Sequence, residues 1–253
     1  MRRIVLASKS PRRFELLSMT GLTFEVMDAH VDEDAVSAKI PLEQSAAVAA
    51  GAAMGLSFGL SALKSVGISS SSVSISQPND GSDPKVIVNT TPSMYANAEK
   101  MCRALAEAKA RATLNRLEWS SDEAPLVIGS DTVVVTEDEI LGKPKDEEDA
   151  RRMLTSLSGR THRVYTGVAI LSEGMENRIF SAFADVKFHD LDKMQEDLIE
   201  SYIKTGSPMD KAGAYGIQDE GALLIDSISG DYYAVVGLPV AQVNRELRTI
   251  LGY

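Results

Sequence analysis

A basic, hydroxyl-rich segment near the N-terminus has the residue types that bind phosphate. Residues 8–13 read SKSPRR and follow the apolar run 4–7, and Ser10 and Pro11 are typical of an N-cap and first helical position. Free backbone N–H groups and the positive dipole of such a helix start, joined by two hydroxyls and three cations, favour an anion. The alternative is simple capping with solvated arginines. Segment 8–13 is not a Walker A loop, because the pattern G-x-x-x-x-G-K-S/T is absent from the sequence.

A second candidate is Asp131, which lies within the apolar run VIGSDTVVV at 127–135. We expect the segment 129–132 to interrupt a buried strand. A carboxylate at such a break has a raised pKa unless cations or hydrogen bonds keep it ionised, and such groups serve as general bases. The alternative is a turn-forming aspartate with local hydrogen bonds.

Two lysine-bearing segments complete the set. In GKPK at 142–145 the proline fixes the backbone and a lysine can project as a point charge, although most such sequences are plain turns. In DKAGAYGIQ at 210–218, small residues allow a ligand close to the backbone, and Lys, Tyr and Gln offer donors and a stacking face. We expect structural roles for His162, in a strand, and for Cys102, on a helix.

The composition limits the functions that these residues can serve. The 253 residues are 44% hydrophobic and 25% charged, with a net charge of −10, which excludes a wholly disordered or collagen-like chain and disfavours duplex binding. An anionic ligand must therefore meet a local basic island. One cysteine and three dispersed histidines give neither a disulfide nor a metal-binding spacing, and the N-terminus has too few apolar residues for a signal peptide. We expect a cytoplasmic protein.

Residues 37–93 differ from the rest, with only six charged residues among 57. The uncharged run 44–63 contains glycines in a G-x-x-x-G register, but it is too rich in Ser, Gln and Gly for a membrane span, so a helix or flexible loop is favoured. Serine dominates 65–76, followed by QPNDGSDP at 77–84. We interpret 37–93 as an insertion whose second half is disordered.

The remaining chain alternates strand and helix patterns, which predicts an α/β fold. A helix over 94–117 would place Met101, Leu105, Ala108 and Ala112 on one face with Lys109 beside them. The other expected elements are strands at 4–7, 126–135, 163–171, 178–188, 222–228 and 232–236, and helices at 11–17, 146–157, 192–204 and 240–251.

Together the motifs resemble the Maf family of nucleoside triphosphate pyrophosphatases. In order, they are SKSPRRFELL (8–17), Asp32-Glu33 after FEV (24–26), LAEAKA (105–110), GSDT (129–132), LGKP (141–144), LSGRTHRVYT (157–166), DKAGAYGIQ (210–218) and GDYYAVVGLP (230–239). Each is weak alone, but their ordered concurrence is specific. The resemblance covers 1–36 and about 94–253, and it departs at 37–93, where the family has a much shorter connection.

The resemblance implies a single catalytic domain, 1–36 with 94–253, built as a curved mixed sheet flanked by helices around a nucleotide-binding cleft. It implies hydrolysis between the α and β phosphates with a divalent metal, Mg²⁺ or Mn²⁺. Asp131 would accept the proton of the attacking water, and Glu33 would help to hold metal or water, so both are catalytic and metal candidates. The implied substrate-binding residues are Ser8, Ser10, Arg12, Arg13, Lys109, Thr132, Lys143, Lys211 and Gln218.

Arg12, Thr132 and Gln218 match the positions that distinguish the subfamily acting on dTTP and UTP, and an amide at Gln218 can pair with the imide edge of a pyrimidine. The alternatives are a 7-methyl-GTP pyrophosphatase and a nucleotide-binding regulatory protein linked to cell division, with little turnover. The resemblance also implies a homodimer with no nucleic-acid or membrane partner.

Overall fold

The computed structural model describes residues 2–40, 73–76, 85–88, 94–120 and 124–253. The chain divides into two units, Met1–Pro41 with Met94–Tyr253, and Leu42–Ser93. In the smaller unit, β3 (Val73–Ser76) and β4 (Lys85–Val88) pair antiparallel, two strands that the sequence did not predict. The rest of the predicted disorder and the run 44–63 lie outside the described residues. Among the helices that the structure does describe, none is long and apolar enough to cross a membrane.

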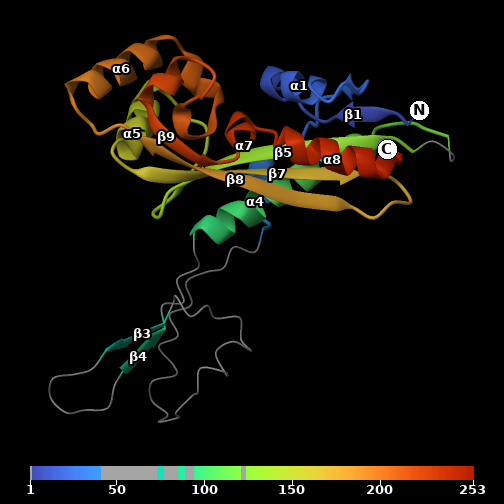
Figure 1. The fold of residues 1–253 in the computed structure, drawn as a ribbon, viewed down its shortest axis with the longest axis horizontal. Coiled ribbons are helices and arrows are strands. Elements are labelled where there is room, and N and C mark those ends of the chain that lie inside the picture. The colour runs from blue at the N-terminus through green and yellow to red at the C-terminus, as the bar shows by residue number, and fades with distance from the viewer. Residues whose placement is uncertain (1, 41–72, 77–84, 89–93, 121–123) are drawn as a thin grey trace. The chain divides into compact units, whose positions relative to one another are not determined.

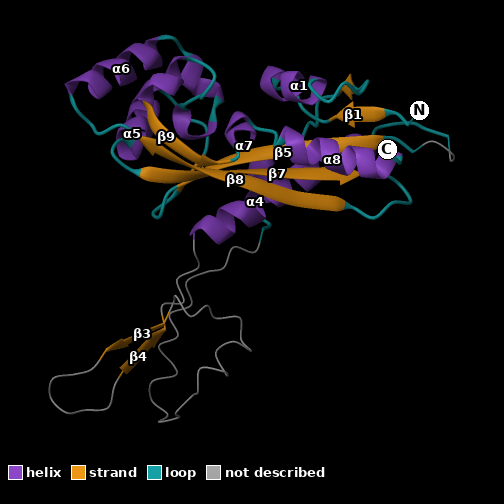
Figure 2. Ribbon diagram, in the orientation of Figure 1, coloured by secondary structure: helices purple, strands orange, loops and turns teal. Residues whose placement is uncertain are grey.

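The larger unit is built on an open, seven-stranded mixed sheet, as the resemblance predicts (Figure 2). Its order is β2-β1-β5-β7-β8-β9, with β6 paired to β5. The pairs β1–β2 and β1–β5 are parallel, and the others are antiparallel. The strands are β1 (Ile4–Leu6), β2 (Glu25–Val26), β5 (Leu126–Val135), β6 (Ile140–Leu141), β7 (Thr161–Leu171), β8 (Arg178–Phe188) and β9 (Ile225–Gly230).

Helices cover both faces of this sheet (Figure 1). They are α1 (Pro11–Ser18), α2 (Glu33–Ser37), α4 (Met94–Leu114), α5 (Glu147–Leu157), α6 (Lys193–Lys204), α7 (Tyr232–Val236) and α8 (Val240–Leu251). On one face α4 packs against residues of β1, β5 and β7, and on the other α1, α7 and α8 share a core with β5 and β7. Three short 3-10 helices, at Ser207–Asp210, Ala212–Ala214 and Glu220–Leu224, fill the connections after α6.

Glycines in the sheet allow α4 to approach very closely. A Cβ added to Gly129 of β5 would lie 2.1 Å from the Ala106 carbonyl oxygen, and one on Gly167 of β7 would lie 2.4 Å from that of Cys102. The small side chains of α4 therefore face the sheet. This corrects the predicted helix face, of which only Leu105 is buried, and it buries Lys109 with the same stripe.

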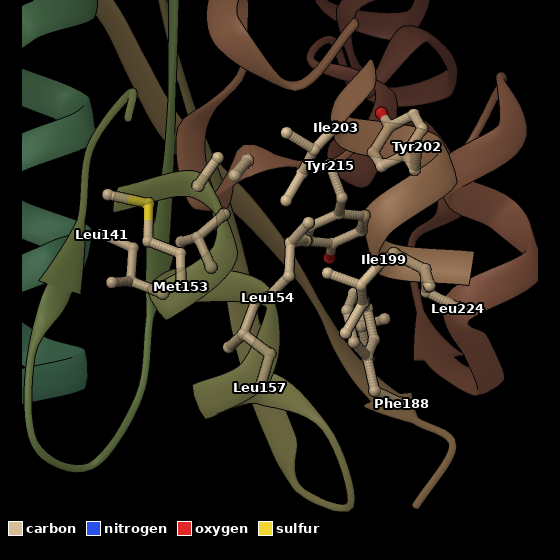
Figure 3. Packing of buried hydrophobic residues seen from close by; sticks show 14 of the residues in the cluster. Leu141, Met153, Leu154, Leu157, Phe188, Ile199, Tyr202, Ile203, Tyr215 and Leu224 are labelled. Atoms are coloured by element: carbon tan, nitrogen blue, oxygen red, sulfur yellow. The ribbon is translucent and has the colours of Figure 1, made fainter. Parts of the chain in front are cut away.

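A separate core beneath α5 and α6 holds the glycine-rich loop in place. The ring of Tyr215 lies among the aliphatic side chains of this cluster (Figure 3) and packs edge-on against Phe188 and His162. The His162 Nε2 atom is 2.7 Å from the Tyr215 hydroxyl, and burial lowers the pKa of His162 to about 3. The histidine is therefore neutral and structural, as predicted.

Two predicted elements are wrong. Residues 129–132 do not interrupt β5, because Gly129 to Thr132 keep regular register with Ala169 to Thr166 of β7. Residues 232–236 form helix α7 and not a strand, because the Asp231 side chain accepts hydrogen bonds from the backbone N–H groups of Tyr233 and Ala234 and so caps a helix. The strand expected over 222–228 begins only at Ile225.

Candidate active site

The candidate site lies where one edge of β5 has no neighbouring strand. On this edge β1 pairs with Leu126 to Ile128 and β6 pairs with Val134 and Val135, while β7 occupies the opposite edge. No described strand therefore covers residues 129–133 on this side. Side chains alternate between the faces of a strand, so Asp131 points towards α4 and Thr132 towards α1 and α7. Both faces meet at the open edge.

On the α4 side, one ammonium joins the two predicted catalytic carboxylates. The Nζ atom of Lys109 lies 2.6 Å from Asp131 Oδ1 and 2.7 Å from Glu33 Oε1. The side chains of Lys109 and Asp131 are only 11% and 8% exposed, whereas that of Glu33 is 47% exposed. The sequence-predicted residues Glu33, Lys109 and Asp131 are thus brought together.

The two carboxylates differ in environment. Burial raises the pKa of Asp131, and the charges of Lys109 and Arg13 oppose that rise without cancelling it. Burial also acts to raise the pKa of Glu33, but its hydrogen bond to Lys109 and the charges of Lys109, Lys143 and Arg13 outweigh that effect and lower it. Asp131 is therefore the stronger base of the pair, and Glu33 remains a carboxylate.

Local structure places Glu33 at this position. It is the first residue of α2, whose N-cap Asp32 accepts a 2.9 Å hydrogen bond from the backbone N–H of Ala35. The two residues of the Asp32-Glu33 motif therefore have different roles: Asp32 caps the N-terminus of α2, and Glu33 contacts Lys109.

On the other face, Arg13 is held by neutral acceptors alone among the described residues. Its Nε donates to the Gly237 carbonyl at 2.9 Å, Nη2 to Thr132 Oγ1 at 3.1 Å and Nη1 to Ser8 Oγ at 3.4 Å. Burial lowers its pKa, yet a guanidinium stays charged. Its charge therefore remains available to an anion. The Ser10 side chain makes no capping bond, although its backbone N–H donates to Ser8 Oγ at 3.2 Å.

Three other cations of the recognised motifs are already paired with carboxylates: Lys9, Arg12 and Lys211. Lys9 Nζ is 2.5 Å from Asp28 Oδ2, and Arg12 Nη1 is 3.6 Å from Asp210 Oδ2. Lys211 donates to Asp210 at 2.7 Å and to the backbone carbonyl of Ser207 at 2.5 Å. The Lys211 ammonium is thus neutralised within its own loop, and its predicted contact with a triphosphate stays a prediction.

Two predicted residues are exposed and form no ion pair or side-chain hydrogen bond with the described part of the site. Lys143, after β6, contributes only through its charge, which helps to lower the pKa of Glu33. Gln218 lies exposed beyond the buried Tyr215. The substrate-binding roles of Lys143 and Gln218 therefore stay predictions.

Several residues that organise the site did not emerge from the sequence. Asp219 accepts hydrogen bonds from Tyr202 at 2.9 Å and from Ser207 at 2.6 Å, and it lies 3.3 Å from the Lys211 ammonium. Asp210 links Arg12 to Lys211. Asp210 and Thr166, which contacts Thr132, stand inside the recognised motifs, so the signal was present, but a motif does not reveal which residues touch.

The donor set suits a hard divalent cation bound together with a ligand. Among the described residues, no three His, Cys, Asp or Glu side chains form a metal-binding group. Mg²⁺ is commonly held by one or two carboxylates together with substrate phosphates and keeps several waters. Glu33 and Asp131, both within 2.7 Å of one Lys109 ammonium, supply such a carboxylate pair, so the residues present fit this kind of ion.

Fold and site together define an open-sheet α/β protein in which a buried carboxylate, Asp131, lies near the basic start of helix α1. The family model of Maf-like proteins matches residues 3–58 and 61–250. The chain belongs to the Maf family, as the sequence motifs predict.

Curated relatives match along almost the whole chain. A dTTP/UTP pyrophosphatase of Geobacillus sp. (strain WCH70) is 36% identical over 250 residues, which cover 99% of each chain. A dTTP/UTP pyrophosphatase of Bacillus cereus (strain G9842) is 36% identical over 248 residues, covering 98% of this chain and 95% of the relative. A protein of the same name from Bacillus cytotoxicus is 35% identical over the same length.

Proposed function

We propose that this protein is a nucleoside triphosphate pyrophosphatase that hydrolyses dTTP and UTP to the monophosphate and pyrophosphate. The observation that carries the proposal is the buried Lys109 ammonium, which contacts both Glu33 and Asp131. Arg13 adds a guanidinium that forms no ion pair with a carboxylate among the described residues. Family membership and the names of the full-length relatives support the same reaction and the same substrates.

Asp131 accepts the proton of the water that attacks the α-phosphorus, and the bond to the bridging oxygen breaks to release pyrophosphate. Its raised pKa makes it a better base than an exposed aspartate. Arg13 and the start of α1 bind the phosphates, because phosphoryl transfer depends chiefly on positioning and charge neutralisation. Arg12, Thr132 and Gln218 would favour dTTP and UTP over 7-methyl-GTP, and the Gln218 amide would pair with the imide edge of the pyrimidine.

Glu33 and Asp131 would hold a Mg²⁺ or Mn²⁺ ion. When bound, the ion would neutralise charge on the phosphate oxygens. In its absence the Lys109 ammonium lies between the two carboxylates and holds them close together. The cytoplasmic location and the homodimer that the resemblance implies belong to this proposal as well.

A nucleotide panel tests the proposal. Pyrophosphate release is measured for dTTP, UTP, dCTP, ATP and 7-methyl-GTP with Mg²⁺ or Mn²⁺, and dTTP and UTP should give the highest kcat/KM. Asp131→Asn should lower kcat by at least about 10²-fold. Asp138→Asn, an exposed carboxylate paired with Arg160, is the matched control and should not change kcat.

Three outcomes contradict the proposal in different ways. Preference for 7-methyl-GTP would assign the other subfamily, and tight binding without pyrophosphate under either metal would favour a regulatory protein. Full activity of Asp131→Asn would remove the general-base role and leave the reaction itself standing.

A further inference from the structure

A line of hydroxyl groups connects Arg13 to the backbone of α7. Arg13 Nη2 donates to Thr132 Oγ1 at 3.1 Å, and Thr132 Oγ1 lies 2.8 Å from Thr166 Oγ1. Thr166 Oγ1 in turn donates to the Ala234 carbonyl oxygen at 2.6 Å. Thr132 and Thr166 are direct cross-strand partners in β5 and β7, so the sheet register itself sets their contact.

Counting protons fixes the direction of every bond in this line. A hydroxyl has one proton and two lone pairs, and a carbonyl oxygen only accepts. The proton of Thr166 is committed to Ala234, so Thr166 must accept from Thr132. The proton of Thr132 therefore points away from Arg13, and Thr132 offers the guanidinium a lone pair.

The same end of α7 holds Arg13 by a second route. The Gly237 carbonyl accepts from Arg13 Nε at 2.9 Å and from Ser130 Oγ at 2.9 Å. Gly237 has φ +124°, a conformation that favours glycine, and a Cβ there would lie 3.4 Å from both Arg13 Nε and Thr132 Oγ1. The carbonyl of Gly237, the C-cap residue of α7, thus orients the guanidinium directly, and the Ala234 carbonyl within α7 does so through Thr166.

We propose that Thr166 is a positioning residue for substrate binding: it fixes the proton of Thr132, and Thr132 thereby holds Arg13 in the orientation that receives the triphosphate. This rests on the proposed function, in which Arg13 binds phosphate. Thr166 is fully buried, and the hydroxyl of Thr132 lies between it and Arg13. It acts with neutral groups only, so it orients Arg13 without cancelling the charge that the phosphates require.

Thr166→Val keeps the shape of the side chain and removes the hydroxyl, so Thr132 can turn its proton towards Arg13 and lose the role of acceptor. KM for every hydrolysed triphosphate should rise by about five- to tenfold while kcat changes less than twofold, because the lost interaction serves binding. Thr166→Ser retains the hydroxyl and should restore KM. Thr113→Val is the matched control, because Thr113 is equally buried and its Oγ1 has no hydrogen-bond partner among the described residues.

A binding measurement keeps the inference independent of turnover. Calorimetry with inorganic tripolyphosphate should show the same five- to tenfold loss of affinity for Thr166→Val, and no loss for Thr113→Val or Thr166→Ser. In an Arg13→Ala background Thr166→Val should add nothing, since the residue through which it acts is gone.

The inference is overturned if Thr166→Val binds tripolyphosphate as tightly as wild type, if Thr166→Ser fails to rescue, or if the effect persists without Arg13. A wild-type protein that binds tripolyphosphate but hydrolyses no nucleotide would contradict the proposed function alone. The affinities of the variants would still decide the role of Thr166.

Discussion

At the scale of single residues, the site depends on one shared positive charge. Lys109 contacts two carboxylates, and removing it would leave Asp131 buried without its closest cation. Breaking a buried ion pair by deleting one partner is far more costly than replacing the whole pair, because the remaining charge is left without compensation. Lys109 therefore contributes to folding as well as to the site.

We expect Lys109→Met to lower the free energy of unfolding by about 3 kcal/mol, measured by urea denaturation at pH 7. Adding Asp131→Asn should recover most of that loss, since the unpaired charge disappears. Lys143→Met, an exposed lysine without an ion pair among the described residues, should stay within about 0.5 kcal/mol of wild type. A double variant no more stable than Lys109→Met would show that packing, and not charge, is what Lys109 contributes.

At the scale of elements, the distance between α4 and the sheet determines where Lys109 lies. Gly129 and Gly167 touch the helix backbone at positions where no side chain fits. The helix carries the ammonium, and β5 carries its partner Asp131. Any shift of α4 away from the sheet therefore separates the two charged groups.

Gly129→Ala should destabilise the protein by more than about 2 kcal/mol and reduce kcat/KM at least tenfold, because the new Cβ would overlap the Ala106 carbonyl and displace α4. Thermal unfolding and steady-state kinetics measure the two effects. Gly142→Ala is the control, since a Cβ there meets nothing within 4 Å. Equal behaviour of the two variants would mean that the close helix contact is not required.

Elements with strong local signals could be predicted from the sequence. Ser10 with Pro11, Asp146 and Asp192 mark the starts of α1, α5 and α6, and the apolar positions of α5 are the buried ones. The predicted buried face of α4 was wrong because it was chosen from the apolar side chains of the helix itself. The glycines of β5 and β7 bring the helix so close that only its small side chains fit against the sheet. Residues 232–236 have a strand-like composition, but they form a helix because the Asp231 side chain caps its N-terminus.

The site could be predicted as a set of residues but not as a set of contacts. Asp131 was evident as a carboxylate in an apolar run, and Glu33, Lys109, Arg13 and Thr132 followed from motifs. That Arg12 faces Asp210 and Lys211 faces Asp219 depends on the path of the chain after α6, which local sequence does not specify. The five cations predicted to bind substrate, Arg12, Arg13, Lys109, Lys143 and Lys211, are therefore not equivalent.

At the scale of the whole molecule, one buried histidine makes stability depend on pH. The pKa of His162 is about 3 in the folded protein, below the ordinary value of 6.5. A depressed pKa contributes stability that is present above pH 6.5 and is lost as pH falls from 6.5 towards 3, because the unfolded chain binds the proton first.

His162→Gln removes this titration and keeps a group that can hydrogen bond to Tyr215. Between pH 6 and pH 4 the free energy of unfolding of wild type should fall more steeply than that of the variant, by about 1.4 kcal/mol per pH unit. Chemical denaturation at several pH values measures both slopes. A His162→Gln curve that runs parallel to that of wild type would refute the assignment.

The division of the chain leads to a final prediction about residues 42–93. Every residue assigned to the site belongs to the unit Met1–Pro41 with Met94–Tyr253, and the smaller unit is nearly uncharged and carries none of them. Replacing 42–93 by a flexible Gly-Ser linker should therefore leave kcat and KM for dTTP within about twofold of wild type, since the closure entropy of such a linker changes only slowly with its length. The sensitive point is Glu33, because α2 ends at Ser37, close to the cut. A second linker joined after position 45 separates the two causes of any loss: activity regained with it would locate the defect in α2, and activity lost with both would show that the segment itself takes part in catalysis.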